Sequence, residues 1–262
     1  MKIGYIQFNP VFGEVDRNLD FVKTTLRNAD ADLIVLPELF NSGYTFTDIN
    51  EVRKLSEEIP NGKTTQDLIT IAKEKNIYIA GGIPEKFENC YFNSSVLVGP
   101  NGFIGKYRKS HLFFEENLWF QTGETGFEVF NINGINVGML ICFDWIFPEA
   151  MRTLALKGAD IILHMTNLVL PFYQISATTR AVENRVFIIL SNRYGTEKRN
   201  GREFHFTGQS EIVSPKGEIL VQSLAEEDDM KIIDINPEEA RKKSINEYND
   251  LFKMRRTDLY FR

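Results

Sequence analysis

A strand–helix–strand pattern occurs twice in this chain, and no other feature of the sequence constrains the fold as much. In the first copy, apolar residues recur at helical spacing over Val15–Ala29, and the apolar run 33–36 follows. In the second copy, the apolar run 137–141 precedes a predicted helix over Pro148–Lys157, and a strand at 160–164 comes next. Such units predict parallel strands joined through helices. Their local similarity is typical of two related halves, although strands of similar composition would produce it too.

Other strands are joined by short turns instead of helices. Four further apolar runs are expected to pair as two hairpins, 93–98 with 103–107 and 208–213 with 218–221. Their linkers, Gly-Pro-Asn-Gly and Ser-Pro-Lys-Gly, are typical of hairpin turns. Thr64 or Thr65 is a candidate cap for a helix that precedes a strand at 78–80. Helix-linked and hairpin-linked strands together predict an α/β fold with mixed sheets covered by helices.

Charge and cysteine content exclude several classes of protein. The formal net charge is −6 and the pI is about 5.3, and no Lys/Arg cluster forms a basic stripe, so nucleic acid is not an expected partner. The N-terminus reads as a strand and not as a secretory signal, and no apolar run is long enough to cross a bilayer. Cys90 and Cys142 are too few for a disulfide framework. We expect a soluble cytoplasmic protein that binds no membrane.

Three residues that could carry chemistry follow apolar strands. Cys142 stands directly after the run 137–141, Glu38 after the run 33–36, and Lys109 after the run 103–107. A carboxylate, an ammonium and a thiol could divide acyl-transfer chemistry as general base, oxyanion stabiliser and nucleophile. Taken singly, each has an ordinary explanation, because most free cysteines are buried and inert and most charged side chains cap loops or face water. Spacing alone does not show that the three converge.

The sequence offers two alternative sites. A cysteine–histidine pair would need a histidine near Cys142, and His164 ends a strand expected to neighbour the strand before Cys142. His111 and His205 are the other candidates, and for all three a hydrogen-bonded structural histidine is the simpler interpretation. A zinc site is disfavoured because neither cysteine has a close Cys or His partner. Cys90, beside two aromatic residues, is interpreted as a packing residue.

Several motifs in order give the chain its resemblance to a known family. Leu-Pro-Glu-Leu around Glu38, Tyr-Arg-Lys-Ser-His-Leu-Phe around Lys109 and Cys-Phe-Asp-Trp-Ile-Phe-Pro-Glu from Cys142 resemble the motifs of the nitrilase superfamily of carbon–nitrogen hydrolases. Arg-Ala-Val-Glu-Asn-Arg from Arg180 and Asn-Arg-Tyr-Gly from Asn192 add to the match, which spans nearly the whole chain. The resemblance implies a four-layer α-β-β-α sandwich with two mixed sheets face to face. It also implies that residues 1–262 form a single domain.

The resemblance also implies roles for individual residues. Glu38 would be the general base, Lys109 would stabilise the oxyanion and Cys142 would be the nucleophile. The backbone N–H of Phe143 would be the second oxyanion donor. Many members have a second glutamate after the lysine, and the spacing to Gly123 favours Glu116 over Glu115. No metal and no cofactor is required.

Substrate specificity is less constrained by the sequence. Tyr44, Trp145 and Asn167 are the candidate pocket residues, the last within the loop 166–173. Ile146 stands where many relatives carry an arginine, which disfavours an α-keto acid amide as substrate. The expected reaction is hydrolysis of a small aliphatic amide or N-carbamoyl compound through a Cys thioester. A nitrilase is the alternative, and an acyltransferase or a non-catalytic scaffold is less favoured.

The C-terminal segment suggests how the protein assembles. The last segment, from Pro237, is charged and then aromatic, and an aromatic tail such as 246–262 usually docks on its own core or on another subunit. Family members commonly pair through helices near the nucleophile. We therefore expect a homodimer or a higher homo-oligomer in which this tail docks on the partner subunit.

Overall fold

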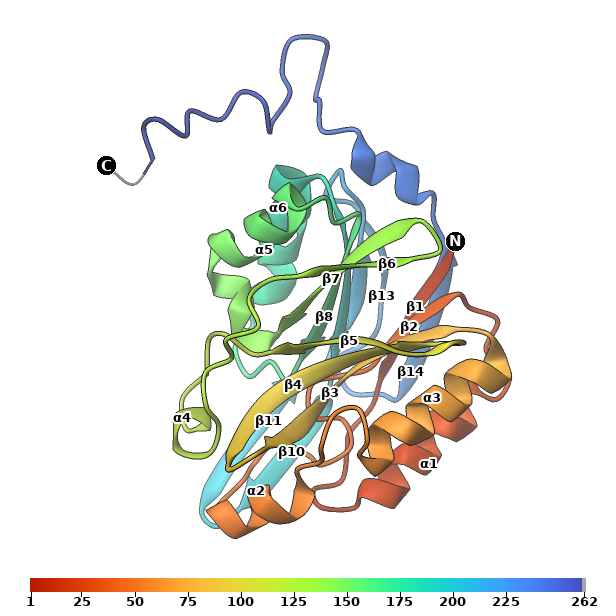
Figure 1. Ribbon diagram of the computed structural model, residues 1–262, viewed down its shortest axis with the longest axis vertical. Helices are drawn as coiled ribbons and strands as arrows, with labels where there is room; N and C mark the ends of the chain where they lie inside the picture. The colour runs from red at the N-terminus through yellow and green to blue at the C-terminus, as the bar shows by residue number, and fades with distance from the viewer. Residues whose placement is uncertain (261–262) are drawn as a thin grey trace.

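Two mixed six-stranded sheets lie face to face in the computed structural model, which describes residues 1–260 (Figure 1). The first sheet has the order β14 (Asp229–Asp234), β1 (Lys2–Gln7), β2 (Leu33–Val35), β3 (Tyr78–Phe87), β4 (Cys90–Gly99) and β5 (Gly102–Arg108). The second has the order β13 (Ile219–Gln222), β12 (Glu211–Val213), β9 (Phe187–Asn192), β8 (Ile161–Thr166), β7 (Ile135–Ile141) and β6 (Val129–Ile132). The predicted α-β-β-α sandwich is confirmed.

Both predicted strand–helix–strand units are present, one in each sheet. Helix α1 (Val15–Leu26) joins β1 to β2, which run parallel with Ile3 opposite Leu33. Helix α5 (Pro148–Leu156) joins β7 to β8, which run parallel with Val137 opposite Ile161. Because the units belong to different sheets, the carboxyl ends of β2 and β7 can deliver side chains to a common site between the layers.

Helices cover the outer face of each sheet. Helices α1 and α3 (Lys63–Lys75) bury their apolar stripes against β2 and β3, with Val22, Leu68 and Ile79 in one cluster. Helices α5 and α6 (Tyr173–Asn184) cover the second sheet. The smaller helices are α2 (Ile49–Leu55), α4 (Glu116–Trp119) and the 3₁₀ helices η1 (Cys142–Ile146) and η2 (Pro237–Arg241).

The two sheets share a closely packed interior. Tyr5 and Leu97 from the first sheet and Met139 from the second belong to one buried cluster. Polar contacts also join the layers, because the Ser95 hydroxyl lies 3.5 Å from Met139 Sδ and the Ser191 hydroxyl donates to the Ile6 carbonyl at 2.9 Å. Side chains between the sheets are therefore largely removed from water.

Three local expectations needed correction. Helix α3 begins at Lys63 after Gly62, so neither threonine is its cap; the Thr64 N–H donates to Glu57 instead. The strand expected at 78–80 continues to Phe87 because its partner β4 pairs with it along that whole length. Part of the run 208–213 is not strand, and a separate hairpin of β10 (Tyr194–Arg199) and β11 (Arg202–Thr207) precedes it.

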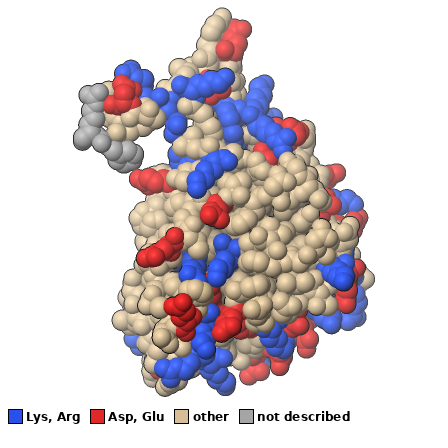
Figure 2. Space-filling model, viewed as in Figure 1, with Lys and Arg blue, Asp and Glu red and all other residues tan. Residues whose placement is uncertain are grey.

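The surface carries charges of both signs, and the C-terminal tail leaves the sandwich. On the face shown in Figure 2, acidic and basic side chains are interspersed without a continuous basic stripe. Within residues 1–260, no helix is long and apolar enough to cross a membrane. After η2 the chain extends beyond the end of the sheets (Figure 1), where the Arg152 guanidinium packs 5.2 Å from the Phe252 ring centroid. Residues 261 and 262 of the predicted tail lie outside the described residues.

Candidate active site

Cys142 lies in a strained turn at the carboxyl end of β7. Its backbone φ is +39°, a left-handed value that non-glycine residues rarely adopt, and such strain is concentrated at functional sites. Residues 142–146 form the 3₁₀ helix η1, and α5 then begins at Pro148, as the sequence predicts. The cysteine is 6% exposed. The turn thus holds a nearly buried thiol at the edge of the second sheet.

Glu38 comes from the other sheet, in the loop after β2. Gly82 on β3 lets this loop approach closely, because a Cβ at that position would lie 2.6 Å from the Glu38 Cα. The loop is also held by backbone hydrogen bonds from Phe40 N to Gly82 O at 3.0 Å and from Gly82 N to Pro37 O at 3.0 Å. The Glu38 side chain is also fully buried. The loop contacts and this burial together hold the carboxylate in one position.

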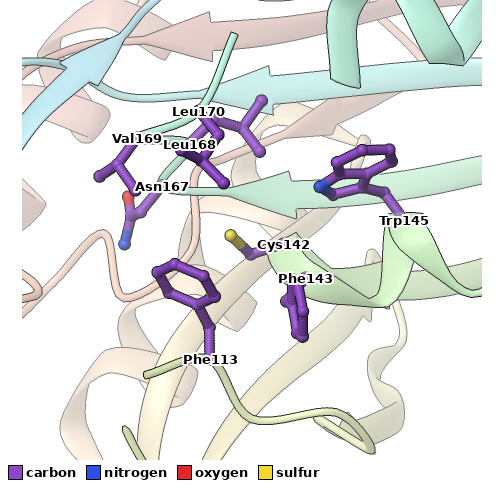
Figure 3. Close-up of a pocket in the computed structure, with 8 residues that line it drawn as sticks. All are labelled: Phe113, Cys142, Phe143, Trp145, Asn167, Leu168, Val169 and Leu170. Carbon is purple, nitrogen blue, oxygen red and sulfur yellow. The ribbon is translucent and has the colours of Figure 1, made fainter. Parts of the chain in front are cut away.

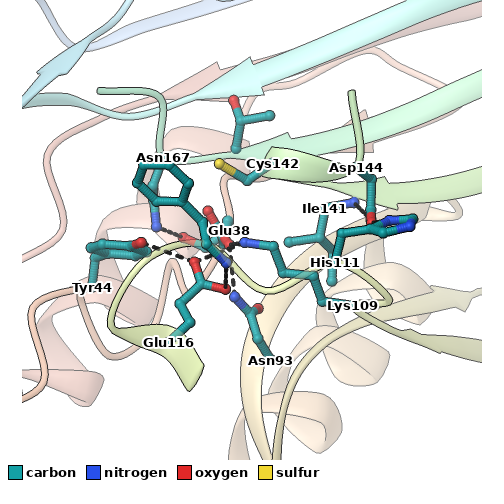
Figure 4. Close-up of polar contacts among 12 residues, drawn as sticks. Glu38, Tyr44, Asn93, Lys109, His111, Glu116, Ile141, Cys142, Asp144 and Asn167 are labelled. Carbon is teal, nitrogen blue, oxygen red and sulfur yellow. Dashed lines mark hydrogen bonds and ion pairs between the residues drawn. The ribbon is translucent and has the colours of Figure 1, made fainter. Parts of the chain in front are cut away.

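Lys109 lies directly after β5 and joins two carboxylates (Figure 4). Its Nζ donates to Glu38 Oε1 at 2.8 Å and to Glu116 Oε1 at 2.8 Å. Asn93 Nδ2 donates to Glu38 Oε1 as well, at 2.7 Å. In Figure 4 the Cys142 sulfur lies on the other side of the lysine ammonium from Asn93. The structure therefore brings Glu38, Lys109 and Cys142 together.

The structure also distinguishes the two glutamates after the lysine. Glu116 opens helix α4 and is 4% exposed, and its Oε1 accepts from the Tyr44 hydroxyl at 2.9 Å as well as from Lys109. Its Oε2 accepts from the Phe113 backbone N–H at 3.3 Å. Glu115 forms an ion pair with Arg202 instead. Glu116, as the sequence favoured, is the one that faces Lys109.

Burial and charge set the protonation of these groups. Burial raises the pKa of Glu38 from 4.5 to about 7, although Lys109 opposes the shift. Burial disfavours the charge on Lys109, but Glu116 and Glu38 outweigh it, so the lysine pKa is raised and the ammonium persists. Burial, followed by the charge of Glu38, raises the pKa of Cys142 well above its usual 9.0. In the resting site the proton therefore stays on the thiol. The pKa of Glu38, about 7, allows this carboxylate to accept that proton at neutral pH.

A second polar network fixes the turn that carries the cysteine. Asp144 Oδ2 accepts from the Ile141 backbone N–H at 2.9 Å and from the Tyr107 hydroxyl at 2.8 Å, and its Oδ1 lies 2.8 Å from His111 Nδ1. The His111 ring stacks on Phe147 with centroids 3.7 Å apart. Sequence reasoning missed Asp144 and Tyr107. The position of Asp144 two residues after Cys142, where a carboxylate can cap a short turn, was the available signal.

A small pocket opens at the thiol (Figure 3). It is lined by Phe113, Cys142, Phe143, Trp145, Asn167, Leu168, Val169 and Leu170. Asn167 and Trp145 thus lie where they were predicted, and the Trp145 ring stacks on Tyr173 with centroids 5.4 Å apart. Tyr44 lines a neighbouring cavity with Glu116, so it belongs to the charged cluster and not to this pocket. Ile146 is not among the lining residues.

Several buried polar atoms around the site lack protein partners. Within the described residues, Glu38 Oε2, Asn93 Oδ1 and Asn167 Oδ1 have no hydrogen-bond partner. Asn167 is nevertheless held in place, because its Nδ2 donates to the Glu38 carbonyl at 3.0 Å. Buried unpaired acceptors are costly in a folded protein and are typical of a site that a ligand completes. The acceptors suit a substrate or water that brings N–H or O–H groups.

His164 does not form a cysteine–histidine pair. Its Nε2 lies 3.1 Å from the backbone carbonyl of Cys142, and its Nδ1 lies 2.6 Å from the Tyr173 hydroxyl. Burial lowers the pKa of His164 to about 4, so the ring is neutral. His205 is exposed on β11. For His164, therefore, the hydrogen-bonded structural interpretation agrees with the geometry.

Comparison with known proteins agrees with this arrangement. The model of the carbon–nitrogen hydrolase family matches residues 2–243. A nitrilase of Pyrococcus abyssi is 44% identical over 265 residues, covering 100% of both chains, and a 2-oxoglutaramate amidase of Bacillus subtilis is 30% identical over 270 residues, covering 98% of both. The crystal structure of a carbon–nitrogen hydrolase from Helicobacter pylori superposes with a TM-score of 0.88 at 24% identity, covering 99% of this chain and 96% of the other. The chain therefore belongs to the carbon–nitrogen hydrolase family, the nitrilase superfamily, and is an enzyme of the amidase and nitrilase type.

Proposed function

We propose that this enzyme hydrolyses a small aliphatic amide or N-carbamoyl compound through a thioester on Cys142. The carrying observation is the buried cluster in which one ammonium, that of Lys109, contacts Glu38 and Glu116 beside a protonated thiol. A carboxyl group whose pKa is about 7 is matched to accept and return a proton at neutral pH. These properties suit a nucleophile that is activated only as the substrate arrives.

The residues divide the reaction as follows. Glu38 removes the thiol proton as Cys142 Sγ attacks the carbonyl carbon, and the developing oxyanion is stabilised by the Lys109 ammonium and the Phe143 backbone N–H. Collapse of the tetrahedral adduct breaks the C–N bond, and Glu38 returns the proton to the departing ammonia or amine. Glu38 then takes a proton from water, whose oxygen attacks the thioester. The acid leaves and the thiol is restored. Glu116 keeps Lys109 charged and oriented.

The lining of the pocket supports a small neutral substrate. Around the thiol it presents aromatic and aliphatic side chains and one amide, that of Asn167, with no charged group among the described lining residues. A substrate carboxylate would find no cation among these lining side chains, and Lys109 is already paired with Glu38 and Glu116, so burying that charge would be costly. Strong preference for dicarboxylic monoamides would contradict this assignment.

The test is ammonia release from a panel of small amides, N-carbamoyl amines and nitriles. We expect turnover of neutral amides by the wild-type enzyme and none by Cys142→Ala. Cys90→Ala is the matched control, because Cys90 is the other free cysteine and lies on β4 away from the pocket. Equal turnover by wild-type enzyme and Cys142→Ala would contradict the thioester mechanism.

A nitrilase is the second candidate, favoured by the relative named a nitrilase that is 44% identical over the whole chain. The same three side chains would serve, because a nitrile gives a thioimidate on Cys142 that water converts to the thioester. Higher kcat/KM for nitriles than for the matching amides in the panel would select this reaction.

We further propose a homodimer that forms through helix α6 and the tail. Helix α6 presents apolar side chains to solvent, including Ile175, which is 76% exposed, and Phe172 before it is 56% exposed. The tail adds Tyr248, which is 80% exposed. A second copy would cover these groups. Deleting the residues after Asp250 should lower the sedimentation coefficient; an unchanged value would contradict a role for the tail.

The cytoplasmic location stays a prediction.

A further inference from the structure

His164 is a buried, chemically capable residue that the proposed reaction does not use. It lies on β8 with 0% exposure, between the turn of Cys142 and helix α6. Its two ring nitrogens are both engaged, with the Cys142 carbonyl oxygen 3.1 Å from Nε2 and the Tyr173 hydroxyl 2.6 Å from Nδ1. A buried ring with both nitrogens hydrogen-bonded is held in one orientation, and its two partners decide its tautomer.

The partners fix which nitrogen carries the proton. A backbone carbonyl can only accept, so Nε2 is the donor to Cys142 O. The neutral ring then has Nδ1 as an acceptor, and the Tyr173 hydroxyl is its donor. Tyr173 is itself fully buried, and its ring is stacked with Trp145 at 5.4 Å between centroids. The chain of donors therefore runs in one direction, from Tyr173 through His164 to the cysteine carbonyl.

That carbonyl belongs to the same peptide unit as the Phe143 N–H. The peptide group is planar and trans, so its C=O and N–H point in opposite directions, and fixing one fixes the other. The fixation matters here because Cys142 has a φ of +39°, which a relaxed chain would leave. A donor on the carbonyl also polarises the peptide and strengthens its N–H as a donor.

We propose that His164, held in its Nε2–H form by Tyr173, is a positioning residue that aims and polarises the Phe143 N–H toward the oxyanion. The inference rests on the proposed function, in which that N–H stabilises the tetrahedral adduct. His164 touches neither substrate nor thiol in this role. It acts through the peptide between Cys142 and Phe143, and its loss affects steps that develop an oxyanion.

The test compares two probes of Cys142 in His164→Met and His164→Gln. A small aliphatic aldehyde adds to the thiol as a hemithioacetal whose oxygen occupies the oxyanion position, whereas iodoethane, which has no carbonyl group, alkylates the thiol without placing an oxygen there. His164→Met removes the donor at similar volume, and we expect kcat and aldehyde affinity to fall about 10- to 100-fold, with KM and the alkylation rate nearly unchanged. His164→Gln restores an N–H near the position of Nε2 and should recover most of both losses.

A second variant covers the case in which His164→Met folds poorly. Tyr173→Phe keeps the ring that stacks on Trp145 and removes only the hydroxyl, and we expect aldehyde affinity to fall about 3- to 10-fold in the same direction. A parallel fall of aldehyde affinity and alkylation rate, or wild-type values in both His164→Met and Tyr173→Phe, would overturn the positioning role. A wild-type enzyme that neither releases ammonia nor binds the aldehyde would contradict the proposed function itself, and the positioning role with it.

Discussion

Two buried glutamates of the first sheet, Glu38 and Glu85, have similar surroundings and opposite properties. Both are 0% exposed, and both accept hydrogen bonds from strands β4 and β5 or the residue after them. The pKa of Glu38 is raised to about 7. Burial also disfavours the charge of Glu85, but hydrogen bonds from Arg108, Lys106 and Ser94 outweigh it and lower its pKa.

The difference lies in how many donors each carboxylate has. Glu85 accepts hydrogen bonds from the side chains of Lys106, Arg108 and Ser94, and neither of its oxygens is left unpaired. Glu38 shares a single lysine with Glu116, and its Oε2 has no partner within the described residues. A carboxylate with surplus cations is a structural ion pair, whereas one with a shared cation and an open oxygen can exchange a proton.

The largest expected difference between the two comes from replacing each carboxylate by an amide. Glu38→Gln removes the base, and we expect kcat/KM to fall about 10²- to 10⁴-fold with little loss of stability, because its ionisation is already disfavoured. Glu85→Gln should retain near-wild-type kcat/KM but lose about 2 kcal/mol of stability, since two cations remain without their partner. Ammonia release and urea unfolding measure the two effects. Equal activity losses in both variants would erase the distinction.

The cations give the next largest contrast. Lys109→Met leaves Glu38 and Glu116 buried without a cation, so we expect loss of detectable turnover and about 3–5 kcal/mol of stability. Lys106→Met leaves Arg108 on Glu85, and Lys106 is partly exposed, so a stability loss of about 1 kcal/mol and normal turnover are expected. Thermal unfolding together with kcat checks both. A Lys109→Met enzyme with substantial turnover would remove the lysine from the oxyanion role.

pH should act on the two carboxylates in opposite senses. The raised pKa of Glu38 contributes stability that is present below pH 4.5 and lost as the pH rises through about 7, where Glu38 ionises. The lowered pKa of Glu85 contributes stability that is present above pH 4.5 and lost as the pH falls. Over pH 5 to 8, we therefore expect Glu38→Gln to gain stability relative to wild type as the pH rises. The stability of Glu85→Gln should approach that of the wild type only on acidification below pH 4.5.

Activity should follow the ionisation of Glu38 alone. Because the ionised carboxylate is the base, wild-type kcat/KM should rise with pH around 7, and Glu85→Gln should keep that limb. The residual activity of Glu38→Gln should lack it. A pH profile of kcat/KM for the three enzymes measures this, and a limb that survives in Glu38→Gln would assign it to another group.

The sequence predicts part of this contrast between Glu38 and Glu85. Apolar runs placed Glu38, Lys109 and Cys142 after strands, and strand alternation sends neighbours such as Asn93 and Ser94 to opposite faces of the sheet. Spacing could not reveal that Glu38 and Cys142 meet, because their contact depends on how two separate sheets pack. Nor could spacing reveal the left-handed backbone conformation of Cys142. A non-glycine residue keeps that conformation only when its surroundings impose it.

Asn93 and Ser94 offer the smallest and most specific test of the comparison. They are consecutive on β4, yet Asn93 Nδ2 donates to Glu38 Oε1 at 2.7 Å and the Ser94 hydroxyl donates to Glu85 Oε2 at 2.6 Å. Donation stabilises the charged form, so Asn93→Ala should raise the pKa of Glu38 and move the activity limb to higher pH, lowering turnover at pH 7 several-fold. Ser94→Ala should leave the limb in place and cost about 1 kcal/mol of stability. If the limb moves equally in both, the faces are electrostatically coupled, and Glu38 owes its pKa to the sheet as a whole and not to its own few donors.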